Sequence, residues 1–347
     1  DQCPIDWLPQ GIPSLEDAAD VVVRSQVNTL VIAGPGAGKT ELLAQRSCFL
    51  LQTGRCPSPR QILAISFKRD AARNLADRVR LRCGDELAAR FDSMTFDAFA
   101  KGLLDRFLAA TPDGWRPKPA YEINFKINQS TLGRVLRDEL STTDTSLSTS
   151  QRQYIDDREL YSVFTARLTE QCVPRSASSL HVAAHDLWKY FLRRGKSSEL
   201  NFQMIARLAE LILRTNAALT EALRTAYSFV FLDEFQDTSS VHYDLLLTAF
   251  CGSTSVVTAV GDNKQRVNKW AGALEGIFEK YQTAFAADRQ CLRMNFRSAP
   301  ELVRIQGFFA AAIDNTTPPA MARPDASGGE CKAFSFASHV DEAKYVA

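Results

Sequence analysis

The sequence lacks the signals that mark several specialised classes of protein. Its 8 cysteines include no C-x-x-C pair, so the ligand spacing of a zinc ribbon or an iron–sulfur cluster is missing. No apolar run reaches the roughly 18 residues that a membrane-spanning helix needs, and the first residues show no basic-then-apolar signal pattern. We therefore expect a cytoplasmic protein with reduced thiols and without a membrane partner.

A large excess of charge is also missing. Lysine and arginine number 41 and aspartate and glutamate 40, so no global basic field attracts nucleic acid, and any such contact needs a local groove. By contrast, 45% of the residues are hydrophobic, which is enough for two or three packed domains. The chain starts at Asp1 instead of Met and stops inside an expected helix, so we expect it to belong to a longer protein.

Apolar runs and helical periodicity alternate in two parts of the chain. Residues 27–32 form a β-branched apolar run that leads through a glycine-rich turn into a helical pattern at 40–51. The same pattern predicts further strands at 62–66, 229–232 and 256–260, each followed by a helix. Strands that alternate with helices favour an α/β fold with a parallel, doubly wound sheet.

A different pattern lies between residues 101 and 200. Amphipathic segments there predict helices at 130–140, 157–170 and 180–193, and a polar tract occupies 141–150. We interpret this part as a helical insertion into the sheet domain.

A glycine-rich motif, Ala-Gly-Pro-Gly-Ala-Gly-Lys-Thr at 33–40, stands between a predicted strand and a predicted helix. Glycines let backbone N–H groups turn toward phosphate oxygens, and the following helix points its positive end at them. Lys39 is expected to reach the β- and γ-phosphates, and Thr40 to place its hydroxyl on Mg²⁺. The alternative, a glycine-rich turn with a chance Lys-Thr pair, leaves the strand and helix on either side unexplained. We predict that ATP or GTP binds to Ala33, Gly34, Pro35, Gly36, Ala37, Gly38, Lys39 and Thr40.

Two neighbouring carboxylates follow another predicted strand. The segment 230–238 reads Val-Phe-Leu-Asp-Glu-Phe-Gln-Asp-Thr, so an apolar run ends in Asp233 and Glu234. Asp233 is placed to hold the Mg²⁺ shell, and Glu234 to accept a proton from an attacking water. Two solvated acids at a strand end are the alternative, which does not explain why they follow so apolar a run.

The run Asp-Glu-Phe-Gln-Asp at 233–237 resembles motif II, DExQD, of the UvrD/Rep/PcrA-like superfamily 1A helicases. Other motifs of that family appear in its order along the chain. Residues 62–72 resemble motif Ia, residues 95–99 the T-F-H-x-F element, residues 260–273 motif III, and residues 292–298 motif IV.

The resemblance implies a fold, a division into domains and an activity. It implies a RecA-like P-loop NTPase domain 1A at residues 1–103 and 200–278, a helical 1B-like insertion at 104–199, and the start of a second RecA-like domain, 2A, at 279–347. It also implies an ATP-dependent DNA helicase or translocase that moves 3′-to-5′ on single-stranded DNA or tailed duplex DNA. ATP and Mg²⁺ would bind between the two motor domains.

The family also implies roles for matching residues. Gln265 would sense the γ-phosphate, and Arg297 would neutralise transition-state charge from the second domain. Phe296 stands where the family has a tyrosine that stacks on adenine. The catalytic set is then Lys39, Glu234, Gln265 and Arg297. For Arg297, a buried structural ion pair is the alternative.

The same motifs match the DNA track of the family. A base stacked on an aromatic ring gains roughly 1–3 kcal/mol whatever its identity. The residues that the resemblance assigns to DNA are Ser66, Phe67, Arg69, Thr95, Phe96, Asn268 and Trp270, with Lys68 beside them for phosphates. Core packing is the alternative for Phe96 and Phe99.

The chain departs from the family pattern at several positions. In motif III, Asn268 replaces a tyrosine and Ala271 an arginine, which removes a stacking ring and a positive contact from the DNA track. The glutamine that reads adenine upstream of the P-loop has no counterpart near Asp17, and Glu41 stands where relatives often have arginine. Motifs V and VI are absent from these residues.

Two other functions stay open. The departures in motif III favour a DNA-stimulated ATPase, the motor subunit of a repair or defence complex that remodels protein–DNA contacts without processive unwinding. The other is an ATP-dependent interaction module that has lost hydrolysis. Against that module stand Lys39, Thr40, Asp233, Glu234, Gln265 and Arg297.

Overall fold

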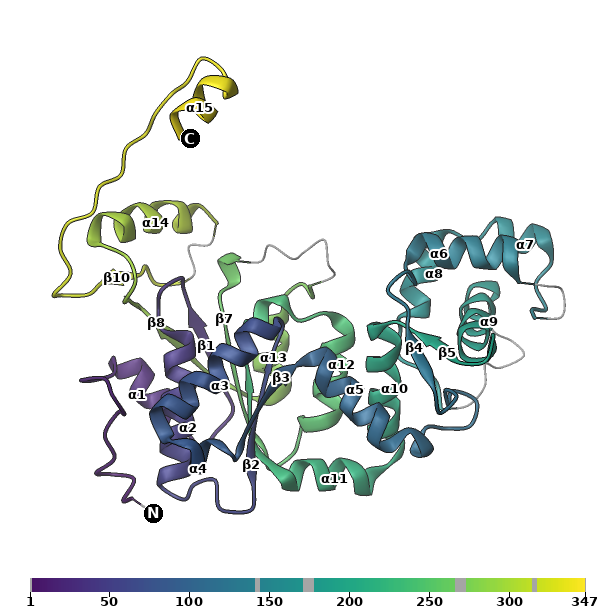
Figure 1. Ribbon diagram of the computed structural model, residues 1–347, viewed down its shortest axis with the longest axis horizontal. Helices are drawn as coiled ribbons and strands as arrows, with labels where there is room; N and C mark the ends of the chain where they lie inside the picture. Colours follow the sequence, from purple (N-terminus) through teal and green to yellow (C-terminus); the bar gives the residue numbers. More distant parts are fainter. Residues whose placement is uncertain (1, 141–143, 171–177, 266–272, 314–316, 347) are drawn as a thin grey trace.

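A six-stranded sheet organises the chain, with its strands in the order β3-β2-β6-β7-β1-β8 (Figure 1). The computed structural model describes residues 2–140, 144–170, 178–265, 273–313 and 317–346. Every pairing in this sheet is parallel, which confirms the predicted α/β fold. In chain order the strands are β1 (Thr29–Ala33), β2 (Gln61–Ser66), β3 (Phe91–Thr95), β6 (Tyr227–Leu232), β7 (Val256–Gly261) and β8 (Asp288–Leu292).

Both faces of the sheet are apolar because successive residues of a strand point to opposite sides. Along β1, Leu30 joins one core and Val31 the other. The helices of the Leu30 face are α5 (Phe96–Phe107), α10 (Phe202–Thr215), α12 (Ser240–Phe250) and α13 (Ile277–Phe285). Those of the Val31 face are α1 (Asp17–Arg24), α2 (Lys39–Gln52) and α3 (Arg69–Cys83). Burial on both sides explains the near-continuous apolar runs that the sequence shows in these strands.

A single buried arginine fastens α1 to α2. Arg46 of α2 has no exposed surface, and its guanidinium donates to the carbonyls of Val22, Val23 and Ser25 at the C-terminal end of α1. The last carbonyls of a helix lack regular partners, and a positive charge suits this end of the helix dipole. Arg46 therefore fixes where α1 ends and where the chain turns into β1.

The insertion lies at the end of the molecule far from α1 (Figure 1). Its elements are η1 (Leu108–Ala110), β4 (Tyr121–Ile123), α6 (Gln129–Arg134), η2 (Val135–Glu139), α7 (Thr149–Gln153), α8 (Asp157–Phe164), α9 (Ser179–Arg193) and β5 (Ser198–Leu200). The helix predicted at 157–170 is shorter than expected, since α8 ends at Phe164. The insertion is also not wholly helical, since β4 and β5 pair in parallel.

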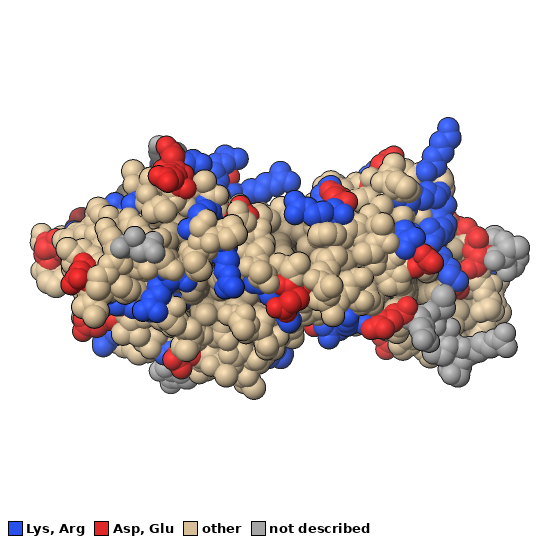
Figure 2. Space-filling view, turned by 90° about the horizontal axis from the view of Figure 1, so that it is seen from below, with Lys and Arg blue, Asp and Glu red and all other residues tan. Residues whose placement is uncertain are grey.

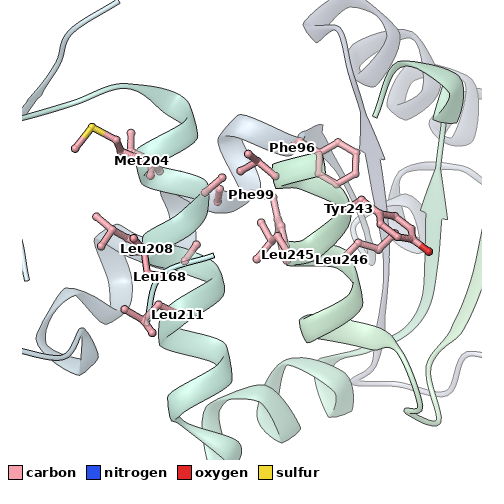
Figure 3. Packing of buried hydrophobic residues seen from close by; sticks show 14 of the residues in the cluster. Phe96, Phe99, Leu168, Met204, Leu208, Leu211, Tyr243, Leu245 and Leu246 are labelled. Atoms are coloured by element: carbon pink, nitrogen blue, oxygen red, sulfur yellow. The ribbon is translucent and has the colours of Figure 1, made fainter. Parts of the chain in front are cut away.

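Helix α10 joins the insertion to the sheet domain through a buried apolar seam. Figure 3 shows Met204, Leu208 and Leu211 of α10 together with Phe99 of α5 and Leu245 of α12. Each of these side chains is at most 6% exposed, and all belong to one core that continues into the insertion. The two parts therefore share a hydrophobic core, although the insertion interrupts the α/β alternation of the sequence.

The sheet extends further along the chain than expected. The sequence analysis assigned residues 279–347 to the second domain, whereas β8 pairs with β1 over its whole length and Tyr281 of α13 is fully buried. The sheet therefore continues to Leu292, because β8 satisfies the backbone groups along the outer side of β1. The division into domains stays a prediction.

The remaining elements connect or follow the sheet. They are α4 (Asp85–Ala88), α11 (Ala217–Ala226), η3 (Phe235–Asp237), η4 (Asn263–Gln265), β9 (Met294–Asn295), α14 (Pro300–Ile313), β10 (Met321–Ala322) and α15 (His339–Val346). Figure 1 shows α15 standing apart from the sheet. Within the described ranges, no helix combines the length and the apolar character needed to cross a bilayer.

Two of the cysteines are joined to each other. Cys48 of α2 and Cys83 at the end of α3 form a disulfide, with Cα atoms 5.4 Å apart. The expectation of reduced thiols is wrong for this pair, because the packing of α2 on α3 brings together two residues that are 35 positions apart.

The seam around α10 predicts a large effect for one truncation. Leu208 is fully buried, so Leu208→Ala should lower the free energy of unfolding by about 2–5 kcal/mol through lost apolar contact and the cavity left behind. Leu81 is 71% exposed, and Leu81→Ala should change stability by no more than about 0.5 kcal/mol. Urea unfolding of both variants checks this expectation, and equal midpoints would contradict it.

Candidate active site

The glycine-rich loop turns sharply before α2 begins. Gly36 and Gly38 have φ angles of 74° and 78°, a conformation that costs a glycine little and other residues much more. Lys39 is the first residue of α2, so the N-terminal end of that helix faces the loop. The first N–H groups of a helix have no partners inside it and carry the positive end of the dipole. The loop therefore has the geometry that binds a phosphate chain.

A segment from much later in the sequence closes on this loop. The backbone N–H of Phe296 donates to the carbonyl of Gly36 (2.8 Å), and Asn295 Nδ2 donates to the carbonyl of Pro35 (3.1 Å). A Cβ on Gly36 would lie only 2.4 Å from Asn295 Oδ1. That oxygen also accepts the backbone N–H of Arg297 (2.9 Å). The motif IV segment is thus built directly onto the loop, and the close approach requires glycine at position 36.

The two carboxylates at the end of β6 differ in their surroundings. Asp233 is 5% exposed, and its Oδ1 accepts the backbone N–H of Glu234 (2.9 Å). Burial, and after it the charge of Glu234, raise the pKa of Asp233 to about 6. Glu234 has a φ of 48°, which strains a residue that carries a side chain. Its Oε2 lies 4.0 Å from Lys39 Nζ. The two acids are therefore held close to the lysine of the loop.

Gln236 connects Glu234 to the loop after β7. Its Nε2 donates to Glu234 Oε2 (2.7 Å), and its Oε1 accepts the backbone N–H of Asp262 (3.0 Å). Asp262 Oδ2 in turn accepts from Gln265 Nε2 (2.6 Å). A Cβ on Gly261 would lie 2.6 Å from Gln236 Oε1, so glycine leaves room for this chain. Hydrogen bonds therefore link Glu234 to Gln265, and we refer to them as the Gln236 relay.

An open cavity of about 890 Å³ lies beside these groups. Its walls include the loop at 34–40, Glu234, Gln265, Phe296 and Arg297. A volume between roughly 300 and 1,000 Å³ is typical of small-molecule sites. Of the residues assigned to the nucleotide from the sequence, all line this cavity except Ala33 and Asp233, which are buried next to it.

Phe296 and Arg297 are both accessible at this cavity. Phe296 is 50% exposed, and a Cβ on Gly38 would lie 3.6 Å from its ring. Arg297 is exposed as well, so the alternative of a buried structural ion pair is wrong.

Two residues assigned to DNA lie in the core instead. Ser66 has no exposed surface, and Phe96 is 4% exposed with its ring stacked on His242 at 4.7 Å. We correct both assignments, because the ring of Phe96 packs against His242 of α12 and Ser66 is fully enclosed at the end of β2, so that neither side chain is open to a base. Phe99 belongs to the same core.

Three other DNA assignments lie at the carboxyl edge of the sheet. Phe67 is half-buried directly after β2, and Arg69 is exposed at the start of α3. Thr95 ends β3 and caps α5 by accepting the N–H of Ala98 (3.1 Å). The last residues of β2 and β3 are paired neighbours, so these groups lie near one another. Asn268 and Trp270 lie outside the described residues.

Charged side chains are mixed over the surface. On the face in Figure 2, lysine and arginine are interspersed with aspartate and glutamate. On this face, attraction of the phosphate backbone of a nucleic acid depends on local charged groups, as expected from the balanced net charge of the chain.

The residues that connect the site had no role predicted from the sequence. Gln236 and Asp262 build the relay, and Asn295 holds the loop, yet none of them had an assigned role. Gln236 lies in motif II, Asp262 in motif III and Asn295 in motif IV, so membership of a motif was the one sign in the sequence that these residues matter. Their hydrogen bonds depend on how β6, β7 and β9 are placed in space.

Comparison with known proteins gives a consistent result. A sequence model described as the UvrD/REP helicase N-terminal domain matches residues 15–286. The chain is 25% identical over 301 residues to the Probable DNA helicase II homolog of Mycoplasma capricolum, covering 80% of this chain and 38% of the relative. It is 23% identical over 344 residues to DNA helicase II of Escherichia coli strain K12, covering 96% and 45%. It is 22% identical over 349 residues to ATP-dependent DNA helicase PcrA of Leuconostoc citreum, covering 99% and 44%. The chain therefore spans less than half the length of these relatives.

The raised pKa of Asp233 predicts an unusual pH dependence of stability. Because the folded state holds this proton up to about pH 6 while the ordinary value is 3.8, ionisation of Asp233 lowers stability as the pH rises between these values. Asp233→Asn keeps the oxygen that accepts from Glu234 but cannot ionise. Relative to the parent, the variant should therefore gain stability on the order of 2–3 kcal/mol between about pH 4 and pH 7.5.

Urea unfolding without divalent cations at both pH values measures this gain. Asp138→Asn, a change in η2 where no such burial acts, serves as the control. A stability difference for Asp233→Asn that does not change with pH would contradict the prediction.

Proposed function

The chain belongs to the UvrD/Rep helicase family, and on this premise we propose that it supplies the ATP-hydrolysing domain and part of the single-stranded DNA track of a DNA helicase or translocase. The Gln236 relay is the observation that carries the proposal. It joins the proposed proton acceptor, Glu234, to the proposed phosphate sensor, Gln265, across two loops of one cavity. A merely structural pair of acids would need no such link.

Thr40 and Asp233 are the residues that would hold Mg²⁺. Both offer oxygen, the donor that Mg²⁺ prefers, and a nearby cation would stabilise the ionised form of a buried Asp233. In the ranges that the structure describes, no group of three or more His, Cys, Asp or Glu side chains has the spacing of a metal site. That fits an ion that takes its other ligands from phosphates and water. Mg²⁺ bound there would supply positive charge at the β- and γ-phosphates.

Glu234 is the residue we assign to accept a proton from water. Gln236 donates to its carboxylate (2.7 Å), and Lys39 Nζ lies 4.0 Å from the same oxygen. Lys39 is also held 3.4 Å from the carbonyl of Ala33, at the base of the loop. Lys39 can then bind phosphate while Glu234 faces the same cavity.

Arg297 and Phe296 would act from the segment beyond the sheet. In this structure their backbone is hydrogen-bonded to Asn295 and Gly36, so the segment lies closed against the loop. We propose that Arg297 stabilises charge on the transferred phosphate and that Phe296 contacts the base. Closing and opening of this contact would accompany each turnover.

Single-stranded DNA is the proposed partner at the edge formed by Phe67, Arg69 and Thr95. Arg69 is exposed for phosphate contact, and Phe67 supplies a ring next to it. We extend the proposal to 3′-to-5′ movement, which rests on the family resemblance alone.

Unwinding and simple translocation are separated by one assay. Asn268 and Ala271 depart from motif III of the family and favour a DNA-stimulated ATPase as the second candidate. Strand displacement on a 3′-tailed duplex supports the helicase. DNA-stimulated turnover without displacement supports the second candidate.

The assignment of Glu234 predicts the outcome of a conservative substitution. Glu234→Gln keeps an oxygen that accepts from Gln236 but cannot take up a proton, so turnover of ATP should fall about 100-fold or more. The affinity for ATP should change by no more than a few-fold, roughly, because the phosphate loop is untouched. Glu221→Gln on α11, with the original side chain 70% exposed, is the control and should behave as the parent. Unchanged turnover in Glu234→Gln rules out this residue as the base.

The proposed contact of Phe67 with DNA, directly after β2, can be tested by truncating its ring. If Phe67 stacks on a base, Phe67→Ala should weaken binding of a single-stranded oligonucleotide by roughly 5- to 150-fold, the equivalent of 1–3 kcal/mol. Phe125 is 76% exposed on the insertion, and Phe125→Ala should leave the affinity unchanged. Fluorescence anisotropy at one fixed salt concentration measures both, and equal effects of the two variants argue against a stacking role.

A further inference from the structure

A stretch near the N-terminus forms one wall of the nucleotide cavity. The consecutive residues 12–16 line the cavity together with the glycine-rich loop. Ile12, Pro13 and Leu15 give this wall an apolar surface. Such a surface suits a ring system and does not suit a phosphate. We refer to residues 10–16 as the N-terminal wall.

The N-terminal wall is held by side chains of α2 and α3. Gln45 Oε1 accepts the backbone N–H of Gln10 (2.8 Å), and Gln45 Nε2 donates to the carbonyl of the same residue (2.7 Å). Arg82 Nη1 donates to the carbonyl of Gly11 (3.0 Å). Gly11 has a φ of 66°, and a Cβ there would lie 2.2 Å from Arg82 Nη1. The turn at Gly11 therefore depends on a residue without a side chain.

Glu41 organises these contacts from the first turn of α2, directly after Thr40. Its Oε1 accepts from Gln45 Nε2 (2.7 Å) and from Arg82 Nε (2.9 Å). Its Oε2 accepts from Arg82 Nη2 (3.0 Å) and from Arg78 Nη1 (2.8 Å). Burial opposes ionisation of Glu41, but hydrogen bonds from Arg82, Gln45 and Arg78 outweigh it and lower its pKa. Both hydrogens of the Gln45 amide are thus used, one on Glu41 and one on the wall.

The charges in this part of the cavity are already paired. Arg82 and Arg78 share the carboxylate of Glu41, and the side chain of Arg82 is only 15% exposed. Glu16, at the other end of the wall, accepts the backbone N–H groups of Arg293 and Met294 (3.1 and 2.9 Å). The N-terminal wall is therefore anchored at both ends, and the arginines beside it are paired with Glu41.

We propose that Glu41, Gln45 and Arg82 are positioning residues that hold the N-terminal wall against the nucleoside part of the substrate. The inference rests on the proposed function, since it takes the glycine-rich loop as the phosphate site. The phosphates lie at the start of α2, and the nucleoside extends along the cavity to the wall. Glu41, one residue after the proposed Mg²⁺ ligand Thr40, couples the two ends of the site.

The test compares a nucleotide with its phosphate portion alone. Isothermal titration measures the dissociation constants of Mg·ATP and of Mg·tripolyphosphate for the same 347-residue chain. Arg82→Met should raise the dissociation constant of Mg·ATP roughly tenfold, while the dissociation constant of Mg·tripolyphosphate should stay within about twofold of the parent value. Arg80→Met, on the same helix but paired with Asp77 and Asp85, is the matched control and should change neither.

A double-mutant cycle separates positioning from simple destabilisation. Glu41→Gln should weaken ATP in the same selective way, and adding it to Arg82→Met should weaken ATP no further, because both act through one set of contacts. Additive losses, or a loss that is equal for ATP and tripolyphosphate, would overturn the inference. An equal loss for ATP and tripolyphosphate would mean that Arg82 itself contacts phosphate.

Lys39→Ala shows whether a negative result concerns only the N-terminal wall or the proposed nucleotide site as a whole. If Lys39→Ala weakens both ligands and Arg82→Met weakens neither, the phosphate site stands and the N-terminal wall has no part in binding. If Lys39→Ala weakens neither ligand, the nucleotide site itself is wrong, and the inference fails with it.

Discussion

Parallel pairing makes all six strands of the sheet end at the same edge, and the chemistry of this chain depends on that constraint. The glycine-rich loop leaves β1 there, Asp233 and Glu234 follow β6, and Asp262 follows β7. Asn295 and Pro35, which are 260 positions apart, share a hydrogen bond at this edge. In open parallel sheets, ligands bind outside the carboxyl ends of the strands.

Hydrogen bonds turn this shared edge into a connected site. The Gln236 relay joins the loops after β6 and β7, and Asn295 joins the glycine-rich loop to the segment after β8. Each link uses an amide side chain, which can donate and accept at once. A buried or partly buried network of this kind is stable only when its members are satisfied together. A change at one loop therefore affects its neighbours through defined partners.

The sequence was sufficient for the fold class and for the main groups of the site. Glycine spacing before a helix, and apolar runs that end in acids, are local signals, and the structure has the loop between β1 and α2 and the two carboxylates directly after β6. The roles of these residues stay predictions. The motif did not indicate the burial of Phe96, because its ring packs against His242 of α12, more than 140 positions later in the chain. The pairing of β8 with β1 was missed for a similar reason, since the sequence of a short strand does not indicate which strand it pairs with. The Cys48–Cys83 bond and the contacts of Glu41 likewise require the packing of α2 on α3.

The backbone of Glu234 shows what such a site demands of the chain that carries it. A left-handed φ is easiest for glycine and next for asparagine, so selection for stability alone would favour those residues at this position. Neither of them has a carboxylate. Retaining glutamate there means that the fold accepts a local loss of stability in exchange for an acid held at one fixed angle. Because the rest of the sheet is buried on both faces, its stability can outweigh the local strain at Glu234.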